Sequence, residues 1–267
     1  MYIRVFSDIH LEFGRNFKIP SAQNFFISEL PTDKETILCL AGDICSIESN
    51  RFHESFLNSE LTDRFRKVLY IPGNHEYYNG SITTTDKKLQ EYCDKHGIIF
   101  LQKKSMEIDD IIFIGATLWT NMTDVHPFNA FKIAQYMNDY RKIRIGPTSN
   151  PYQKKLTVNQ VDALHKNHLK FIENELYVYA DRKCVVMTHH APSYECINEY
   201  YRQNSDLNNA YYSNLDELIL QYQPLLFLSG HSHCAYDFNI EKTRLINNCV
   251  GYPGEETGFD PELVIEI

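Results

Sequence analysis

Short apolar runs in the first third of the chain each end in a cluster of polar residues. The runs are residues 2–6, 36–40 and 68–71, and the clusters that follow them contain Asp8, Asp43 and Asn74 respectively. Runs of this length, rich in β-branched residues and closed by Gly or Pro, are typical of buried strands. The pattern therefore predicts strands that carry polar groups at their carboxyl ends.

Helical periodicity appears between and after these strands. The spacing of apolar positions predicts helices over residues 51–61, 84–96, 157–177 and 213–222. Strands that alternate with helices indicate βαβ units, so we expect an α/β fold.

Further strands are expected in the middle and at the end of the chain. Residues 98–101, 106–108 and 111–115 leave little room for helices, and we expect them to form an antiparallel meander beside or facing the first sheet. The final third repeats the first arrangement in the runs 184–187 and 224–228. Short strands are expected at 235–240, 244–247 and 263–267.

The chain shows no repeat, no low-complexity tract and no long linker. Its 267 residues therefore favour one domain, residues 1–267. The least regular stretch is 121–156, which we interpret as an insertion or lid with a short helix near 130–137. A polar, tyrosine-rich loop is expected at 194–212.

Composition excludes some classes of partner. The formal net charge is −9, and long nucleic acids usually need a basic surface, so we expect none as a partner. The seven cysteines are odd in number and none has C-x-x-C spacing, which indicates reduced thiols. Without a secretory pattern at the start or a run able to span a membrane, we expect a cytoplasmic protein with no membrane partner.

Oxygen and nitrogen ligands gather at the predicted strand ends. Six of the eleven histidines lie there together with Asp8, Asp43 and Asn74; they are His10, His75, His189, His190, His231 and His233. The carboxyl ends of strands in an α/β sheet form a crevice where ligands bind. Sulfur is absent from this set, which argues against a structural zinc site. A ligand set of this size fits two metal ions, and the two oxygens of Asp43 could bridge them.

Five motifs in order resemble those of the calcineurin-like metallophosphoesterases. They are Asp8-x-His10, Gly42-Asp43, Gly73-Asn74-His75-Glu76, His189 after an apolar strand, and Gly230-His231-x-His233. The resemblance runs from residue 8 to residue 233 and extends to a group of small, mostly uncharacterised bacterial and phage members. Departures are slight: Ser232 stands where many members have Thr, and Glu76 where Asp is frequent.

The resemblance implies a fold, a reaction and a role for each motif residue. The fold would be a four-layer sandwich of two facing mixed β-sheets flanked by helices. Asp8, His10 and His233 would hold one divalent ion, Asn74, His189 and His231 a second, and Asp43 would bridge them. His75 would protonate the leaving oxygen while a metal-bound hydroxide attacks a small phosphomonoester or phosphodiester. Mn²⁺ is the first choice of metal, with Fe, Zn²⁺ or Ni²⁺ as alternatives.

Several residues keep two interpretations. His189 is favoured as the ligand, and its neighbour His190 would then support the site or contact substrate. Arg141 either binds a phosphate oxygen or forms a surface ion pair with Asp139. A group of tyrosines either lines a site for a base or packs in the core: Tyr194, Tyr200, Tyr201, Tyr211 and Tyr212. A structural or surface role is expected for the other histidines, His53, His96, His126, His165 and His168.

Rival functions remain open at this stage. A nuclease or a phosphoprotein phosphatase could use the same residues. A metal-stabilised interaction scaffold is the alternative without catalysis. The sequence reveals neither the physiological substrate nor the oligomeric state.

Overall fold

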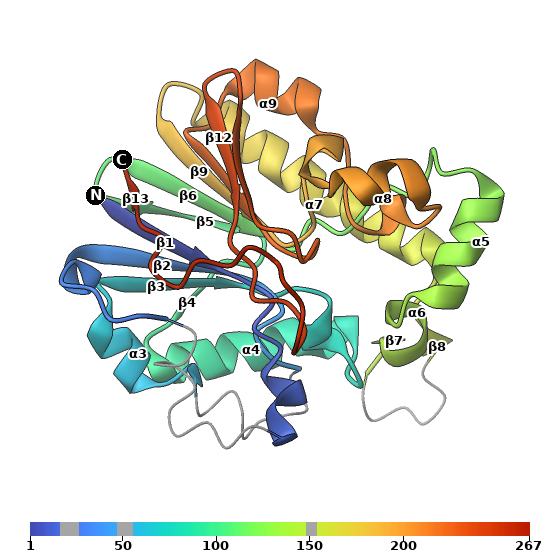
Figure 1. Cartoon of the computed structure of the whole chain (residues 1–267), viewed down its shortest axis with the longest axis horizontal. Helices are drawn as coiled ribbons and strands as arrows, with labels where there is room; N and C mark the ends of the chain where they lie inside the picture. Colours follow the sequence, from blue (N-terminus) through green and yellow to red (C-terminus); the bar gives the residue numbers. More distant parts are fainter. Residues whose placement is uncertain (17–26, 47–55, 148–153) are drawn as a thin grey trace.

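Two β-sheets face each other across the centre of the molecule (Figure 1). The computed structural model describes residues 1–16, 27–46, 56–147 and 154–267. The first sheet has the order β13-β1-β2-β3-β4, and its strands are β1 Tyr2–Phe6, β2 Thr36–Ala41, β3 Lys67–Ile71, β4 Ile99–Phe100 and β13 Ile265–Glu266. β1 to β4 run parallel, and β13 joins β1 antiparallel.

The second sheet has the order β11-β12-β10-β9-β6-β5. Its strands are β5 Lys104–Ile108, β6 Ile111–Ala116, β9 Lys183–Thr188, β10 Leu226–Ser229, β11 Tyr236–Ile240 and β12 Thr243–Asn247. The four central strands are parallel, and the two edge strands are antiparallel to their neighbours. The prediction of an α/β fold with two facing mixed sheets is confirmed.

Helices cover the outer face of each sheet. α3 (Ser59–Arg64) and α4 (Ile82–His96) pack on the first sheet, and α7 (Val158–Val178) and α9 (Asp216–Tyr222) pack on the second (Figure 1). The space between the sheets is filled by aliphatic side chains of both, among them Val5, Leu69 and Val185. Alternate residues of each strand thus face this central core and the helices, which produces the four layers.

Capping residues define the two longest helices. Thr157 and Gln160 form a capping box at the start of α7. α4 begins after Ser81, whose hydroxyl accepts a hydrogen bond from the backbone N–H of Thr83, and ends at Gly97 with φ +70°. No helix in the described ranges is both long and apolar enough to cross a membrane.

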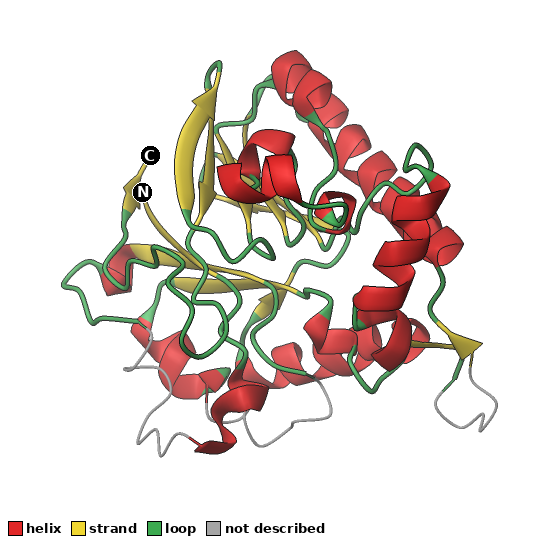
Figure 2. Ribbon diagram, turned by 45° about the vertical axis from the view of Figure 1, so that its right-hand side comes forward, coloured by secondary structure: helices red, strands yellow, loops and turns green. Residues whose placement is uncertain are grey.

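Short elements gather at one end of the sandwich, on the right in Figure 1, and Figure 2 shows the molecule with this side turned forward. They are α5 Pro127–Tyr136, α6 Asp139–Lys142, the hairpin of β7 Arg144–Ile145 with β8 Lys154–Lys155, and α8 Glu199–Asn204. Short 3-10 helices occur at Leu11–Asn16, Asp33–Glu35, His75–Tyr77, Tyr194–Cys196 and Asn208–Ala210. A separate apolar cluster, which includes Tyr77, Trp119, Ile133 and Val161, ties the segment expected as an insertion to α7.

Two expectations need correction or restriction. The three strands between residues 98 and 115 are not one meander: β4 pairs parallel with β3, whereas β5 and β6 form a hairpin in the opposite sheet. The crossover through α4 places β4 parallel to β3. A turn at Lys103, with φ +51°, then directs the chain to the other sheet. The helix expected over 51–61 overlaps α3, which begins at Ser59, while residues 51–55 lie outside the described part.

Candidate active site

The polar residues after β1 and β2 are held together by a continuation of the parallel pairing. The backbone N–H of Asp8 donates to the carbonyl of Gly42, and that of His10 to the carbonyl of Asp43, each at 3.0 Å. Asp8, His10 and Asp43 have φ values of 50–55°, as do His231 and His233 at 66° and 47°. Such left-handed conformations are costly for residues with a side chain and gather at functional sites.

Two glycines let these loops approach each other. A Cβ added to Gly42 would lie 2.5 Å from His189 Nδ1, and Gly42 also has φ +88°. A Cβ added to Gly73 would lie 2.2 Å from Asp43 Oδ1. Only glycine fits at these two positions, which explains why Gly precedes Asp43 and Asn74 in the sequence.

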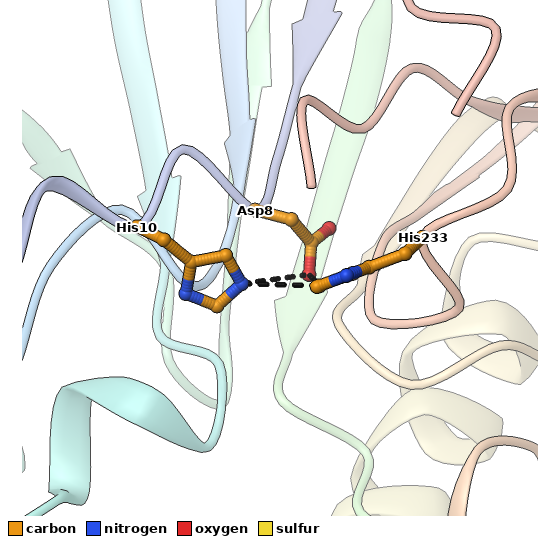
Figure 3. Close-up of side chains that lie close together, drawn as sticks. All are labelled: Asp8, His10 and His233. Atoms are coloured by element: carbon orange, nitrogen blue, oxygen red, sulfur yellow. Dashed lines mark hydrogen bonds and ion pairs between the residues drawn. The ribbon is translucent and has the colours of Figure 1, made fainter. Parts of the chain in front are cut away.

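Asp8, His10 and His233 form the first group of converging side chains. Figure 3 shows both imidazole rings pointing at the Asp8 carboxylate from opposite sides. His233 Nε2 lies 3.3 Å from Asp8 Oδ1, and His10 Nε2 lies 3.9 Å from the same oxygen. The two Nε2 atoms are 3.1 Å apart.

A second group forms around Asp43 and includes Asn74, His189 and His231. His189 Nε2 lies 3.0 Å from Asn74 Oδ1 and 3.4 Å from Asp43 Oδ1. One ligand atom of His231 lies within 4.8 Å of ligand atoms of both Asp43 and His189. The other carboxylate oxygen of Asp43, Oδ2, lies 3.8 Å from His10 Nε2, so the Asp43 side chain touches both groups.

The outer nitrogen of each of these histidines is already engaged. His189 Nδ1 pairs with the Ala41 carbonyl at 2.8 Å, and His231 Nε2 with the Ala210 carbonyl at 3.1 Å. His233 Nδ1 meets Glu255 Oε2 at 2.6 Å, and His10 Nδ1 meets Glu12 Oε1 at 3.3 Å. Such outer partners fix the tautomer so that the inner nitrogen is free to bind a metal.

The donor set fits divalent cations. Once the inner nitrogens are deprotonated, the lone pairs of His10 and His233 face each other at 3.1 Å, and a cation between them would satisfy both. The buried carboxylates already attract positive charge: burial would lower the pKa of His189, but Asp43 raises it to about 10. Burial likewise lowers the pKa of His233, but Asp8 outweighs that effect and raises the pKa to about 9. Metal ions would displace these protons.

Glu76 holds two of the site loops together. Its buried carboxylate accepts hydrogen bonds from the backbone N–H groups of Asp43, Ile44, Cys45 and Gly73 at 2.6–3.2 Å. Burial, followed by the charge of Asp43, raises the pKa of Glu76 to about 7. The carboxylate therefore acts through the backbone rather than pointing into the site.

His75 lies at the edge of the two groups. Its Nδ1 is 2.7 Å from Glu12 Oε1, and its Nε2 is 3.2 Å from the Tyr252 hydroxyl and 3.9 Å from Asp43 Oδ2. Burial lowers the pKa of His75, but Asp43 and Glu12 outweigh that effect and raise it. The two carboxylates thus favour the protonated form of His75. Its distance to Asp43 and His10 would also permit metal binding.

Comparison with known proteins agrees with this geometry. A profile of the family described as calcineurin-like phosphoesterase matches residues 1–235. The chain belongs to this family. It is a metal-dependent phosphoesterase, a hydrolase that acts on phosphate esters.

Two relatives of the phosphoesterase span nearly its whole length. An uncharacterised protein of Acanthamoeba polyphaga mimivirus is 29% identical over 282 residues, covering 99% of this chain and 96% of that protein. The crystal structure of phosphopantetheinyl hydrolase from Mycobacterium tuberculosis superposes with a TM-score of 0.70 at 16% identity, covering 94% of this chain and 89% of that one. The second likeness establishes the shared fold.

Sequence reasoning missed several residues that support the site. Glu12 contacts both His10 and His75, and Glu255 contacts His233. Asp139 accepts hydrogen bonds from Asn74 Nδ2 and the Tyr78 hydroxyl, both at 2.8 Å. Glu12 follows His10 by two residues, a spacing that could have drawn attention to it. The other contacts join distant segments and leave no local signal.

The two predicted substrate contacts lie away from the opening of the site. Arg141 is exposed and donates a hydrogen bond to the Gln135 carbonyl. Asp139 accepts a hydrogen bond from Asn74 and does not pair with Arg141. His190 is buried with its ring 4.2 Å from that of His231, and its Nδ1 lies 3.3 Å from the Thr117 carbonyl.

The remaining histidines and tyrosines take varied places. His165 and His168 are buried against the backbone of Leu118, His126 caps α5, His96 stacks on Tyr92, and His53 lies outside the described residues.

A cavity of about 630 Å³ opens beside His75 and Asn74. Tyr201 and Tyr211 line it, whereas Tyr194 and Tyr212 pack on each other and Tyr200 is exposed.

Proposed function

We propose that this phosphoesterase hydrolyses a small phosphomonoester or phosphodiester at a site that holds two divalent ions. Asp8, His10 and His233 would bind one ion. Asn74, His189 and His231 would bind the other, with Asp43 shared between them. The observation that carries the proposal is the position of the Asp43 carboxylate, with Oδ1 beside His189 at 3.4 Å and Oδ2 beside His10 at 3.8 Å.

The metal ions would lower the pKa of a bound water and neutralise charge on the phosphoryl oxygens. His75 would protonate the oxygen of the leaving alcohol. Its Nδ1 is held by Glu12, so its Nε2 faces the cavity, and the Tyr252 hydroxyl 3.2 Å away helps to orient the ring. A positioned general acid of this kind contributes roughly 10²–10⁴-fold to the rate.

Mn²⁺ is our first choice of metal, and Fe, Zn²⁺ or Ni²⁺ accept the same mixed oxygen and nitrogen ligands. Each candidate group joins carboxylate oxygen with imidazole nitrogen. Metal analysis of protein purified without chelators, with each metal then added to the stripped protein, would decide among them.

The test of the reaction uses purified protein with Mn²⁺ and chromogenic mono- and diesters of phosphate. We expect turnover that EDTA abolishes and that Asp43→Ala removes. Turnover that persists in either case would refute the mechanism.

His75→Asn tests the role of the general acid separately. This variant should keep both metal ions and lose turnover by at least 10²-fold. Loss of bound metal instead would identify His75 as a ligand, an assignment that its position near His10 and Asp43 would also allow.

Two other functions would use the same residues. A nuclease acting on long polymers is disfavoured because no Lys or Arg is among the described residues lining the cavity. Incubation with labelled single- and double-stranded DNA, and with a phosphoprotein, would reveal either activity. A scaffold without catalysis would bind metal and show no turnover on any ester.

A further inference from the structure

The cavity has a metal-binding floor and a wall of different character. Asp43, Asn74, His75, His231 and His233 form the floor. The wall comes from residues 136–138, from positions 197, 198, 201, 205, 207 and 208, and from positions 252, 255 and 256, together with Tyr78 and Tyr211. α5 and α8 thus contribute to the same opening from separate parts of the chain, at the end of the molecule seen in Figure 2.

Tyrosine is the residue type that occurs most often along this wall. Its tyrosines are Tyr78, Tyr136, Tyr201, Tyr211 and Tyr252. Tyr136 and Tyr201 are 59% and 56% exposed, so their faces are available to a ligand. Tyr211 lies with its ring 5.1 Å from that of His231 and therefore extends the aromatic surface down to the floor. Flat rings of ligands stack on such surfaces.

The wall offers no positive charge. Among the described residues that line it there is no Lys or Arg, and its ionisable acids are Glu255 and Glu256. Of the cations near the wall, Arg202 pairs with Glu195 at 2.5 Å and Lys132 with Asp206 at 2.5 Å, whereas the Lys142 ammonium lies over the Tyr78 ring, 4.9 Å from its centre. A second anionic group on the substrate would therefore find no Lys or Arg among the described residues that line the cavity, and the two glutamates would repel it.

Polar groups on the wall remain available for hydrogen bonds. The amide of Asn138 and the hydroxyls of Tyr201 and Tyr211 have no hydrogen-bond partner among the residues described. Asn138 lines the cavity next to Asp139, the residue that holds the Asn74 side chain. An amide provides a donor and an acceptor together, which suits the edge of a heterocyclic ring.

We propose that the substrate is a phosphate ester whose alcohol carries a neutral planar ring with hydrogen-bonding edges, as a nucleoside does, and no second anionic group. This inference rests on the proposed phosphoesterase function. In the reaction water forms the new P–O bond, the P–O bond to the alcohol breaks, and the alcohol leaves with a proton. Stacking on the tyrosines would favour such a substrate by roughly 10-fold or more over the same ester without its ring.

Matched pairs of esters test the ring directly. Adenosine and uridine 5′-monophosphates are each compared with ribose 5-phosphate, which keeps the ester and loses the base. Benzyl phosphate is compared with cyclohexylmethyl phosphate, which has an apolar ring of similar size without the flat aromatic face. We expect kcat/KM to be at least about 10-fold higher for the ring-bearing member of the nucleotide pairs. A similar ratio in the benzyl pair would mean that the aromatic face is sufficient, and a ratio near one there would mean that the polar edges are needed as well.

Two variants connect the preference to the wall. Tyr201→Ala should reduce the ratio of kcat/KM for adenosine 5′-monophosphate to that for ribose 5-phosphate by about 10-fold. Tyr200→Ala is the matched control, because Tyr200 lies on the same helix, is 68% exposed and does not line the cavity. It should leave the ratio within about twofold.

The possible failures are distinct. If metal-loaded protein hydrolyses several esters but no aromatic member exceeds its partner, the ring inference is overturned and the phosphoesterase function stands. An unchanged ratio in Tyr201→Ala would likewise remove the wall from substrate selection. If the metal-loaded protein hydrolyses none of the esters, the proposed function itself fails.

Discussion

Replacement of Gly73 by alanine is the sharpest single test of how the site is assembled. The added methyl group would lie 2.2 Å from Asp43 Oδ1, 2.6 Å from His189 Cε1 and 2.7 Å from the Asp43 backbone nitrogen. An ordinary carbon–oxygen contact is about 3.3 Å, so the Asp43 carboxylate would have to retreat by about 1 Å. The φ angle of Gly73 is not positive, so the effect would be steric and not a matter of backbone conformation.

A retreat of this size should disable the reaction. A misplacement of about 1 Å costs on the order of 10² in rate, and the shared carboxylate of Asp43 is the group displaced. Crowding of a packed interior typically costs about 1–3 kcal/mol of stability. We therefore expect Gly73→Ala to fold, to melt a few degrees lower, and to lose turnover and bound metal together.

Gly97→Ala provides the matched control. A Cβ there meets no atom within 4 Å, but φ is +70°, so alanine would be strained by about 1–2 kcal/mol. Both variants would lose comparable stability in calorimetry, and only Gly73→Ala should lose metal, measured by elemental analysis, and turnover of a chromogenic ester. Retention of metal and near-normal turnover in Gly73→Ala would refute the close approach of the two loops.

Three other features give measurable expectations. Burial lowers the pKa of His168 from 6.5 to about 3, so it is neutral when folded. Its contribution to stability is complete above pH 6.5 and is lost as the pH falls from 6.5 toward 3, because the unfolded chain binds a proton there that the folded chain does not. Between pH 7.0 and about pH 5.5 this amounts to about 1.2 kcal/mol in the free energy of unfolding. Urea titrations at the two pH values should therefore show that the wild type loses about 1.2 kcal/mol more stability on acidification than His168→Gln does. Asp139→Ala removes the partner of Asn74 Nδ2, and calorimetric titration with Mn²⁺ should show metal affinity reduced by roughly 10–100-fold; unchanged affinity would mean that Asn74 needs no support. Mn²⁺ at about 100 times its dissociation constant should stabilise the wild type by about 2.7 kcal/mol, and a melting temperature indifferent to metal would contradict a site formed in the native state.

Local patterns predicted most of the central fold. The strands before Asp8, Asp43 and Asn74 are short, apolar and closed by polar residues, and such runs can be recognised without knowledge of their neighbours. β4 was assigned to the wrong partner because two residues carry too little pattern to choose a sheet. Its pairing follows from the crossover through α4 and from the turn that comes after it.

The tyrosine-rich segment shows a second limit of local patterns. α8 was expected as a loop, since its six residues have no apolar face. It is started by the Asn198 side chain, which accepts a hydrogen bond from the Tyr200 backbone N–H. A cap of this kind can form in many loops, so the sequence alone does not distinguish them.

The supporting residues of the site were beyond the reach of sequence reasoning for a different reason. Glu255 lies 22 positions from His233, and Asp139 lies 65 positions from Asn74. No periodicity connects such pairs, and only the folded chain brings them together. The motif histidines, in contrast, directly follow strands and could be found one by one.

The left-handed backbone at the candidate ligands has a consequence for how this protein tolerates change. Asp8, His10, Asp43, His231 and His233 all adopt φ values that suit glycine better than a residue with a side chain. Each such position costs on the order of 1–3 kcal/mol, so backbone strain is concentrated in the crevice. Mutations selected only for heat resistance should replace these residues by glycine and abolish hydrolysis. Selection that also preserves hydrolysis must instead raise stability through mutations in the helices and sheet cores.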